Sequence, residues 1–149
     1  MKPKTTVSQL HPIAFVVFLK APAERAFSAK DVGVKREILD RLAGQQWLEP
    51  AGRGFRQTTA SLMVATRLRR WGGDIILTHT LAVYAIVEGL HAEPMTREAI
   101  HACGDEVVTA DVIAAFEALE RDGLVRTRRG GRYGLTLRGY RLYEVMTRW

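Results

Sequence analysis

ILDRLAGQQWLEPAGRGFRQT, at residues 38–58, matches FEALERDGLVRTRRGGRYGLT, at residues 116–136. In both stretches the end of a helix leads into a short apolar strand, a turn rich in Gly and Arg, and a second strand. Leu42 aligns with Leu119 at an offset of 77 residues, and one extra residue in the second turn then raises the offset to 78. A repeat of this kind determines the architecture before any single residue is interpreted.

Helix and turn signals surround both copies of the pattern. Pro12 suits the first turn of a helix, Ser28 and Thr109 suit N-caps, and Gly33 suits a left-handed residue that ends a helix. The sequence predicts helices at about 11–20, 28–33, 34–42, 62–71, 77–91, 96–102, 109–122 and 137–146, and hairpins at about 47–58 and 124–136. The predicted fold class is therefore mainly α with small β-hairpins.

The division of the chain is predicted at Gly72-Gly73-Asp74, because two glycines end the preceding helix and allow a change of direction. This gives a first unit at residues 1–73 and a second unit at 74–149. The net charge is +6, but residues 1–74 hold 13 basic and 6 acidic residues, whereas residues 75–149 hold 9 and 10. The basic excess in the first unit favours a polyanionic partner.

Several short motifs resemble the winged helix-turn-helix superfamily. Ala29-x-x-x-Gly33-Val34 is similar to the tight turn between the two helices of that motif. Leu124-Val125-Arg126 and Leu135-Thr136-x-x-Gly139-x-x-Leu142 resemble the wing and following helix of bacterial MarR/PadR-like regulators. The resemblance extends from about residue 11 to residue 146. It implies two tandem winged-helix units, with the second helix of the motif in the major groove and the wing along the DNA backbone or minor groove.

The resemblance maps DNA contacts onto basic residues of both units. Contacts to bases are expected from Lys35, Arg36 and Arg41, because lysine and arginine reach guanine edges. Positioning contacts to phosphates are expected from the turns of the two hairpins, at Arg53, Arg56, Arg126, Arg128, Arg129 and Arg132. If the five of these residues other than Arg126 all contact phosphates, the expected log–log salt slope is roughly −4 to −5. The alternative is that these basic residues form solvated surfaces.

The second unit departs from this pattern in two ways. Residues 103–108 place a longer loop between its two helices. The helix that would enter the groove is expected to expose Asp111, Ala114, Glu117, Ala118 and Glu120, a poor surface for phosphates. The second unit is therefore expected to contribute its arginine-rich turn, or a contact with a second copy or another protein.

Three functions fit these observations. The first is a sequence-specific transcriptional regulator that represses by occupying double-stranded DNA. The second is a winged-helix module that docks proteins in a larger assembly, which the nearly neutral second unit favours. The third is a plasmid or phage replication or partition protein.

Other classes of function have little support in the sequence. No phosphate-binding loop or nucleophile elbow is present, so no enzyme, catalytic residue or cofactor is predicted. The spacing of His101 and Cys103 matches no metal-ligand pattern, and no metal is predicted. A single cysteine fits a reducing compartment, and the expected location is the cytoplasm. No stretch approaches 18 apolar residues, so no membrane span is expected.

Overall fold

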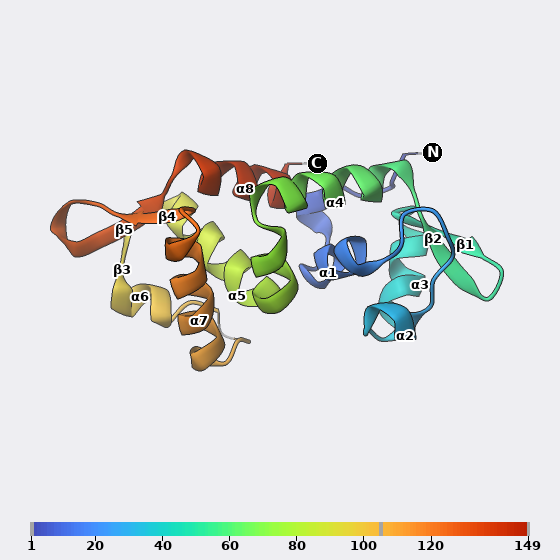
Figure 1. Ribbon diagram of the computed structural model, residues 1–149, viewed down its shortest axis with the longest axis horizontal. Coiled ribbons are helices and arrows are strands. Elements are labelled where there is room, and N and C mark those ends of the chain that lie inside the picture. Colours follow the sequence, from blue (N-terminus) through green and yellow to red (C-terminus); the bar gives the residue numbers. More distant parts are fainter. Residues whose placement is uncertain (1, 105, 149) are drawn as a thin grey trace.

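The computed structural model describes residues 2–104 and 106–148 (Figure 1). Two 3₁₀ turns, eight α-helices and five strands occur in this part of the chain. In chain order the elements are η1 (Val7–Gln9), α1 (Ile13–Lys20), α2 (Ala29–Val32), α3 (Arg36–Gly44), β1 (Leu48–Ala51), β2 (Gly54–Gln57), α4 (Thr59–Trp71), α5 (Gly73–Ala92), β3 (Met95–Thr96), α6 (Arg97–His101), α7 (Thr109–Arg121), β4 (Val125–Thr127), η2 (Arg129–Gly131), β5 (Arg132–Leu135) and α8 (Leu137–Thr147).

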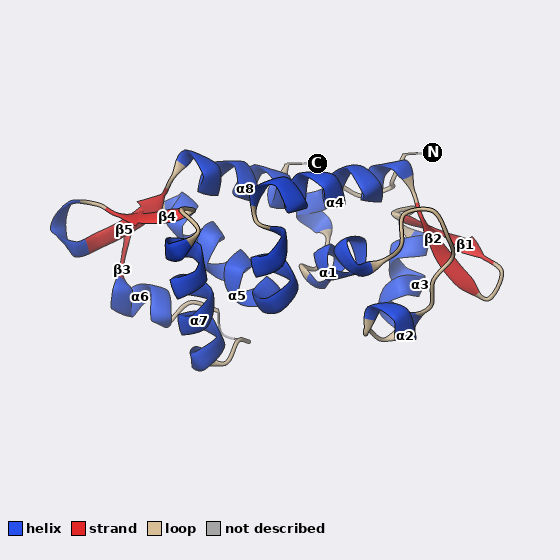
Figure 2. Ribbon diagram, viewed as in Figure 1, coloured by secondary structure: helices blue, strands red, loops and turns tan. Residues whose placement is uncertain are grey.

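The molecule is mainly helical with two small antiparallel sheets, which confirms the predicted fold class at this level (Figure 2). One sheet pairs β1 with β2, and the other has the order β3-β5-β4. The two hairpins, β1–β2 and β4–β5, extend from opposite ends of the elongated molecule (Figure 1). We call residues 48–57 the first hairpin and residues 125–135 the second hairpin.

Helices α3 and α7 end in the same way, because each is closed by a Schellman motif. In α3 the amide of Trp47 donates to the carbonyl of Leu42 at 2.9 Å, and in α7 the amide of Leu124 donates to Leu119 at 2.9 Å. The left-handed residue at the corner is Gln46 in the first case (φ 64°) and Gly123 in the second (φ 76°). The aligned sequences therefore fold into the same corner.

The two hairpins also share their register. Pro50 lies opposite Phe55 in the first hairpin, and Thr127 lies opposite Tyr133 in the second. A third segment pairs with each hairpin at the equivalent position, as an isolated bridge of Phe27 to Phe55 and as the β3–β5 pairing. Phe55 and Tyr133 are both buried, so the inner face of each hairpin packs on the helices.

The bridge to Phe55 requires a glycine beside it. A Cβ atom on Gly54 would clash with the carbonyl oxygen of Phe27. Only a residue without a side chain therefore lets the two backbones approach. Gly54 thereby fixes where the first hairpin joins the helical body.

Equivalent helices of the two halves of the chain pack on each other. α1 packs against α5, and α4 packs against α8 (Figure 1). Pairing of equivalent elements is the arrangement seen at the isologous interface of a symmetric dimer. Buried residues of both halves, among them Phe15, Phe18, Ile76 and Leu119, belong to one continuous hydrophobic cluster. The two halves therefore share a core.

Helix α5 is long and apolar enough to cross a membrane by length and composition, with a mean hydropathy of 1.4. A buried core helix has the same properties, and α5 packs against α1, α7 and α8. It bends at His79, where φ and ψ leave the helical region. The sequence prediction of a helix at 77–91 missed residues 73–76, the first turn of α5.

Other boundaries also differ from the predictions: α1 begins at Ile13, with Pro12 at its N-cap instead of in its first turn. α3 begins at Arg36 rather than Val34, and α4 begins at Thr59 rather than Leu62. Thr58 caps α4 by accepting from the amide of Ser61, a capping box that the prediction did not use. Val108, rather than Thr109, occupies the N-cap of α7, and its side chain makes no capping hydrogen bond.

Candidate nucleic-acid interface

The corner between α2 and α3 is fixed by local hydrogen bonds. The backbone amide of Ser28 donates to the Asp31 carboxylate at 2.8 Å, which completes a capping box at the start of α2. The hydrogen bonds from the Ser28 amide and hydroxyl lower the pKa of Asp31. Gly33 then turns the chain in the left-handed conformation (φ 69°), where a side chain would be strained. These contacts set the angle at which α3 leaves the body.

Arg36 connects α3 to the first hairpin. Its Nη1 donates to the carbonyl of Arg53 in the hairpin turn at 3.1 Å, and its guanidinium lies 5.2 Å from the centre of the Phe55 ring. Its Nε also lies 3.8 Å from a carboxylate oxygen of Asp40. Arg36 therefore fixes the hairpin turn against α3, a positioning role, in addition to the base contact expected from the sequence.

The other two predicted base-contacting residues lie apart from Arg36. Lys35 is the exposed N-cap residue of α3. Arg41 is exposed on the opposite flank of the helix, where it borders a groove beside His11 and Ile13. The three basic residues therefore surround the outer face of α3 rather than form one continuous row.

In the first hairpin, Arg53 and Arg56 are both exposed. Arg53 lies in the turn beside Gly52, and Arg56 lies opposite Glu49 in the strand ladder. No carboxylate in the described residues lies within ion-pair distance of either guanidinium. Both side chains are therefore available to an external anion.

Two of the four arginines in the second hairpin are held by backbone carbonyls. Arg128 donates through Nη2 to the carbonyl of Leu135 at 2.9 Å and lies across Gly134, where a Cβ atom would meet its Nε. Arg132 donates to the carbonyl of Pro94 at 3.3 Å. A guanidinium has five donors, so each of these groups still has N–H bonds to offer.

Arg126 and Arg129 make no side-chain hydrogen bond or ion pair with any described residue. Arg129 lies at the tip, next to two left-handed glycines, Gly130 and Gly131. Within the described chain, no carboxylate pairs with any of the four arginines of this hairpin. Four like charges in seven residues repel each other unless an anion is present.

The outer face of α7 is acidic, as expected, with Glu117 and Glu120 exposed. The prediction that Ala118 is also exposed was wrong: it is buried, because it faces the hydrophobic core. Asp111 is half-buried and bonded to His79 of α5, with Nδ1 and Oδ1 at 2.6 Å. This bond fixes the start of α7 against the bend of α5.

Sequence reasoning missed Arg97, the first residue of α6. Its Nη2 donates to the Tyr133 hydroxyl at 2.6 Å, and its guanidinium lies 5.6 Å from the centre of the Phe116 ring. Arg97 thus links α6, α7 and the second hairpin. It lies one residue after Thr96, an N-cap, which gave no signal that its side chain would reach so far.

Cys103 and His91 each have a structural environment of their own. Burial raises the pKa of the Cys103 thiol, and His91 stacks on Tyr143 at 3.8 Å between ring centres. Among the described residues, no group of three or more His, Cys, Asp or Glu side chains could hold a metal ion.

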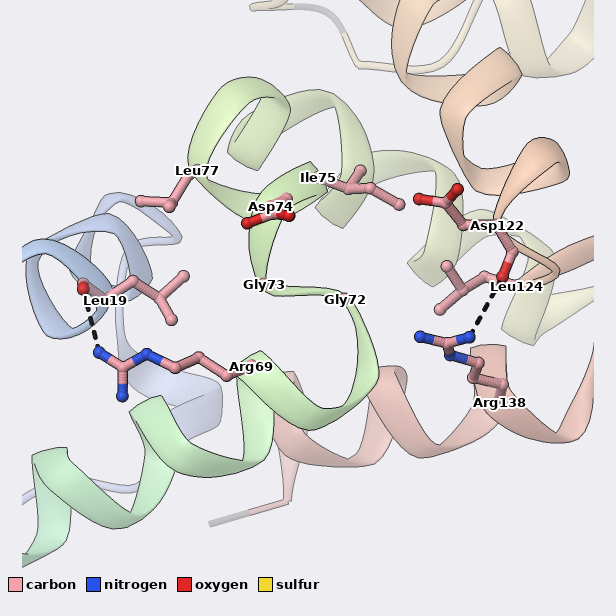
Figure 3. A pocket seen from close by; sticks show the side chains of 10 residues that line it. All are labelled: Leu19, Arg69, Gly72, Gly73, Asp74, Ile75, Leu77, Asp122, Leu124 and Arg138. Carbon is pink, nitrogen blue, oxygen red and sulfur yellow. Dashed lines mark hydrogen bonds between the residues drawn. The ribbon is translucent and has the colours of Figure 1, made fainter.

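A cavity of about 380 Å³ lies where α4 continues into α5 (Figure 3). The two guanidinium groups that line it both donate hydrogen bonds to backbone carbonyls near helix ends. Arg69 donates to the carbonyl of Leu19 near the end of α1, and Arg138 donates to the carbonyl of Asp122 at the end of α7. Arginines at these positions satisfy carbonyls that a helix end leaves unpaired.

We compared the chain with models of known families, with curated proteins and with solved structures, and found no match. The functional assignment therefore depends on the geometry and charges described above.

Proposed function

We propose that this chain is a DNA-binding protein made of two tandem winged-helix units, and that it acts as a sequence-specific transcriptional regulator of the repressor type. Each unit has a short helix, a second helix and a hairpin, in the order that the winged-helix resemblance implies, and in each unit a segment before the short helix pairs with the hairpin. The packing of α1 on α5 and of α4 on α8 joins the units as the two subunits of a dimer would be joined.

The observation that carries the proposal is the charge of the hairpins. Both extend from the ends of the molecule, and their exposed arginines lack carboxylate partners among the described residues (Figure 1). Arginine forms bidentate hydrogen bonds to phosphate, so DNA would supply the missing anions. In this proposal the hairpins position the protein and α3 reads the bases.

A gel-shift titration over a range of salt concentrations tests the role of the second hairpin. The variant Arg126→Ala/Arg129→Ala removes two guanidinium groups that make no side-chain hydrogen bond or ion pair with any described residue. We expect weaker binding and a log–log salt slope that is shallower by about 2, because each lost phosphate contact removes about 0.9. Arg126→Lys/Arg129→Lys should restore most of the slope.

The matched control is Arg25→Ala/Arg121→Ala, which removes the same charge from exposed positions outside both hairpins. We expect this control to leave the slope unchanged. Equal slopes for the wild type and the hairpin variant would remove the second hairpin from the interface.

A second candidate function is supported by α7. The exposed acidic residues Glu117 and Glu120 would repel phosphates, whereas they suit a basic protein surface or a second copy of the chain. Size-exclusion chromatography with mass measurement, alone and with DNA, separates these functions. A stable oligomer that does not bind DNA would favour a docking module.

A further inference from the structure

A groove of about 700 Å³ lies beside α3, between this helix and the segment that joins η1 to α1. We call it the α3 groove. Residues 9–14 form one wall, and the other wall is formed by Ile38, Arg41, Leu42 and Gln45. These four positions have the i, i+3, i+4, i+7 spacing of one helix face, so this wall extends about 10 Å along α3.

The lining of the α3 groove is largely aliphatic. Leu10 and Leu42 are buried, whereas Ile13 and Ile38 are half-buried and still present apolar surface to the groove. A ligand that covers this surface removes it from water, which favours binding of an apolar group. No Phe, Tyr or Trp of the described chain lines the groove, so it offers no flat ring for stacking. It therefore suits an alkyl chain, and its length admits about eight extended carbons.

The polar groups in the same lining are hydrogen-bond donors. Arg41 makes no side-chain hydrogen bond or ion pair with any described residue. His11 accepts from the amide of Ile13 through Nδ1 at 3.1 Å, so the proton of the neutral ring lies on Nε2, which can donate. Gln9 accepts from the amide of Thr6 through Oε1 at 2.9 Å, which leaves its side-chain nitrogen to donate. An acceptor-rich, negatively charged group complements these donors.

No acidic side chain neutralises Arg41. Among the described residues that line the groove there is no Asp or Glu. Asp40, the preceding residue on α3, lies 3.8 Å from the Nε of Arg36 instead. Glu37, one turn before Arg41, forms no ion pair with it in the described part of the chain. The charge of Arg41 is therefore available to a ligand.

The size of the α3 groove favours a small molecule over a protein partner. Ten residues line it, and Leu10, Ala14 and Leu42 are already buried. A stable protein interface uses about 20–30 residues on each side. The volume lies instead within the range of about 300–1,000 Å³ that small-molecule sites occupy. A bare phosphate would leave the aliphatic lining exposed, so the ligand that fits has both an apolar chain and an anionic end.

We propose that the α3 groove binds a medium-chain aliphatic carboxylate, with its chain on the aliphatic lining and its carboxylate on Arg41, and that this ligand weakens DNA binding. The effect on DNA rests on the proposed function, because Arg41 is one of the residues expected to contact bases. Its guanidinium cannot form the same hydrogen bonds with a carboxylate and with DNA at once. By linkage, bound DNA then weakens binding of the carboxylate by the same factor.

Isothermal titration calorimetry of the full chain with octanoate and with 1-octanol tests the site without DNA. The two ligands have the same chain length, but only octanoate is charged. We expect one octanoate to bind per chain, and Arg41→Ala to lower its affinity by about tenfold, because hydrogen bonds to a charged group are lost. The affinity for octanol should not change in this variant. Ile38→Ser should lower both affinities, because it removes aliphatic surface.

Arg25→Ala is the matched control, since it removes one positive charge from an exposed position outside the groove. It should bind octanoate as the wild type does, and Arg41→Lys should recover part of the affinity that Arg41→Ala loses. Unchanged octanol binding shows that Arg41→Ala is folded, and circular dichroism checks Ile38→Ser.

Three results would overturn the ligand site. The first is no binding of octanoate to the wild type. The second is equal octanoate affinity in the wild type and Arg41→Ala. The third is a wild-type dimer that Ile38→Ser converts to a monomer in size-exclusion chromatography with mass measurement, because a second copy would then cover the groove.

Gel-shift titrations with and without saturating octanoate test the effect on DNA. We expect octanoate to lower the DNA affinity of the wild type by about tenfold and to leave that of Arg41→Ala unchanged. An equal effect on both proteins, or no effect on the wild type, would overturn this part of the proposal. If the wild type binds no DNA under any condition, the proposed function fails, and the calorimetry still decides whether the groove binds the carboxylate.

Discussion

Helices α3 and α7 occupy equivalent places in the two halves and differ in what they expose. Both end in the same Schellman corner and lead into hairpins of the same register. The outer face of α3 mixes Arg36 and Arg41 with acidic residues, whereas that of α7 shows Glu117 and Glu120. The comparison shows that one scaffold holds two different surfaces, because the buried positions specify the fold and the exposed positions are free to vary.

The largest expected effects come from the core, where equivalent buried residues test whether the halves fold together. Leu39 and Phe116 occupy the same position of the repeat and are fully buried. We expect Leu39→Ala to cost about 2–5 kcal/mol and Phe116→Ala about 3–5 kcal/mol of unfolding free energy. Because the core is continuous, each variant should unfold in one transition, measured by urea titration with tryptophan fluorescence and circular dichroism. Two separate transitions would show that the halves are independent.

The next largest effect is expected in DNA binding, where variants on the exposed faces of α3 and α7 should act in opposite directions. If α3 reads bases, Lys35→Ala should weaken binding to a specific site by about 1–3 kcal/mol and reduce discrimination against mutated sites. Glu117→Gln/Glu120→Gln, on α7, should instead strengthen binding, because repulsion of phosphates is removed. Binding titrations with specific and scrambled duplexes measure both changes. An equal loss on both duplexes for Lys35→Ala would assign that residue to the backbone.

A smaller effect on stability is expected at the C-terminal ends of α3 and α7. Gln46 and Gly123 hold the same left-handed corner, but only glycine does so without strain. We expect Gln46→Gly to stabilise the protein by up to about 1 kcal/mol and Gly123→Ala to destabilise it by about 1 kcal/mol. A Cβ atom on Gly123 would touch nothing within 4 Å, so backbone strain alone is tested. The change in the denaturant concentration at the midpoint of unfolding measures both effects, provided that the unfolding free energy depends on denaturant with the same slope in each variant. A destabilised Gln46→Gly variant would show that the glutamine side chain has another role.

The smallest effect concerns the caps of α2 and α6. The pKa of Asp31 is lowered by hydrogen bonds from Ser28, whereas α6 has only Thr96 at its cap and no acid three residues later. A lowered carboxyl pKa contributes stability that is present above the unfolded value, here 3.8, and is lost as the pH falls through the folded value. Unfolding titrations between neutral and acidic pH should therefore show a smaller acid-dependent loss for Asp31→Asn than for the wild type. Identical pH profiles would contradict the contribution of this cap.

Much of the fold could be predicted because its signals are local. Ser28, Gly33 and the paired stretches at 38–58 and 116–136 act through neighbours a few residues away, and the helices and hairpins follow from them. Exact helix starts were less accurate, since the start of α4 depends on a capping box between the Thr58 and Ser61 side chains. The sequence also showed which residues are basic, but not which groups each of their side chains contacts.

By itself, the sequence determined the repeat, the two hairpins and the uneven distribution of charge. Only the tertiary structure decided that α1 packs on α5 and α4 on α8, that Arg36 fixes the first hairpin, and that Arg128 is held by the Leu135 carbonyl. It also brought Arg70 and Arg141 together from positions 71 residues apart. The physical reason is that local hydrogen bonds are fixed by short-range sequence, whereas these contacts depend on how whole helices pack on one shared core.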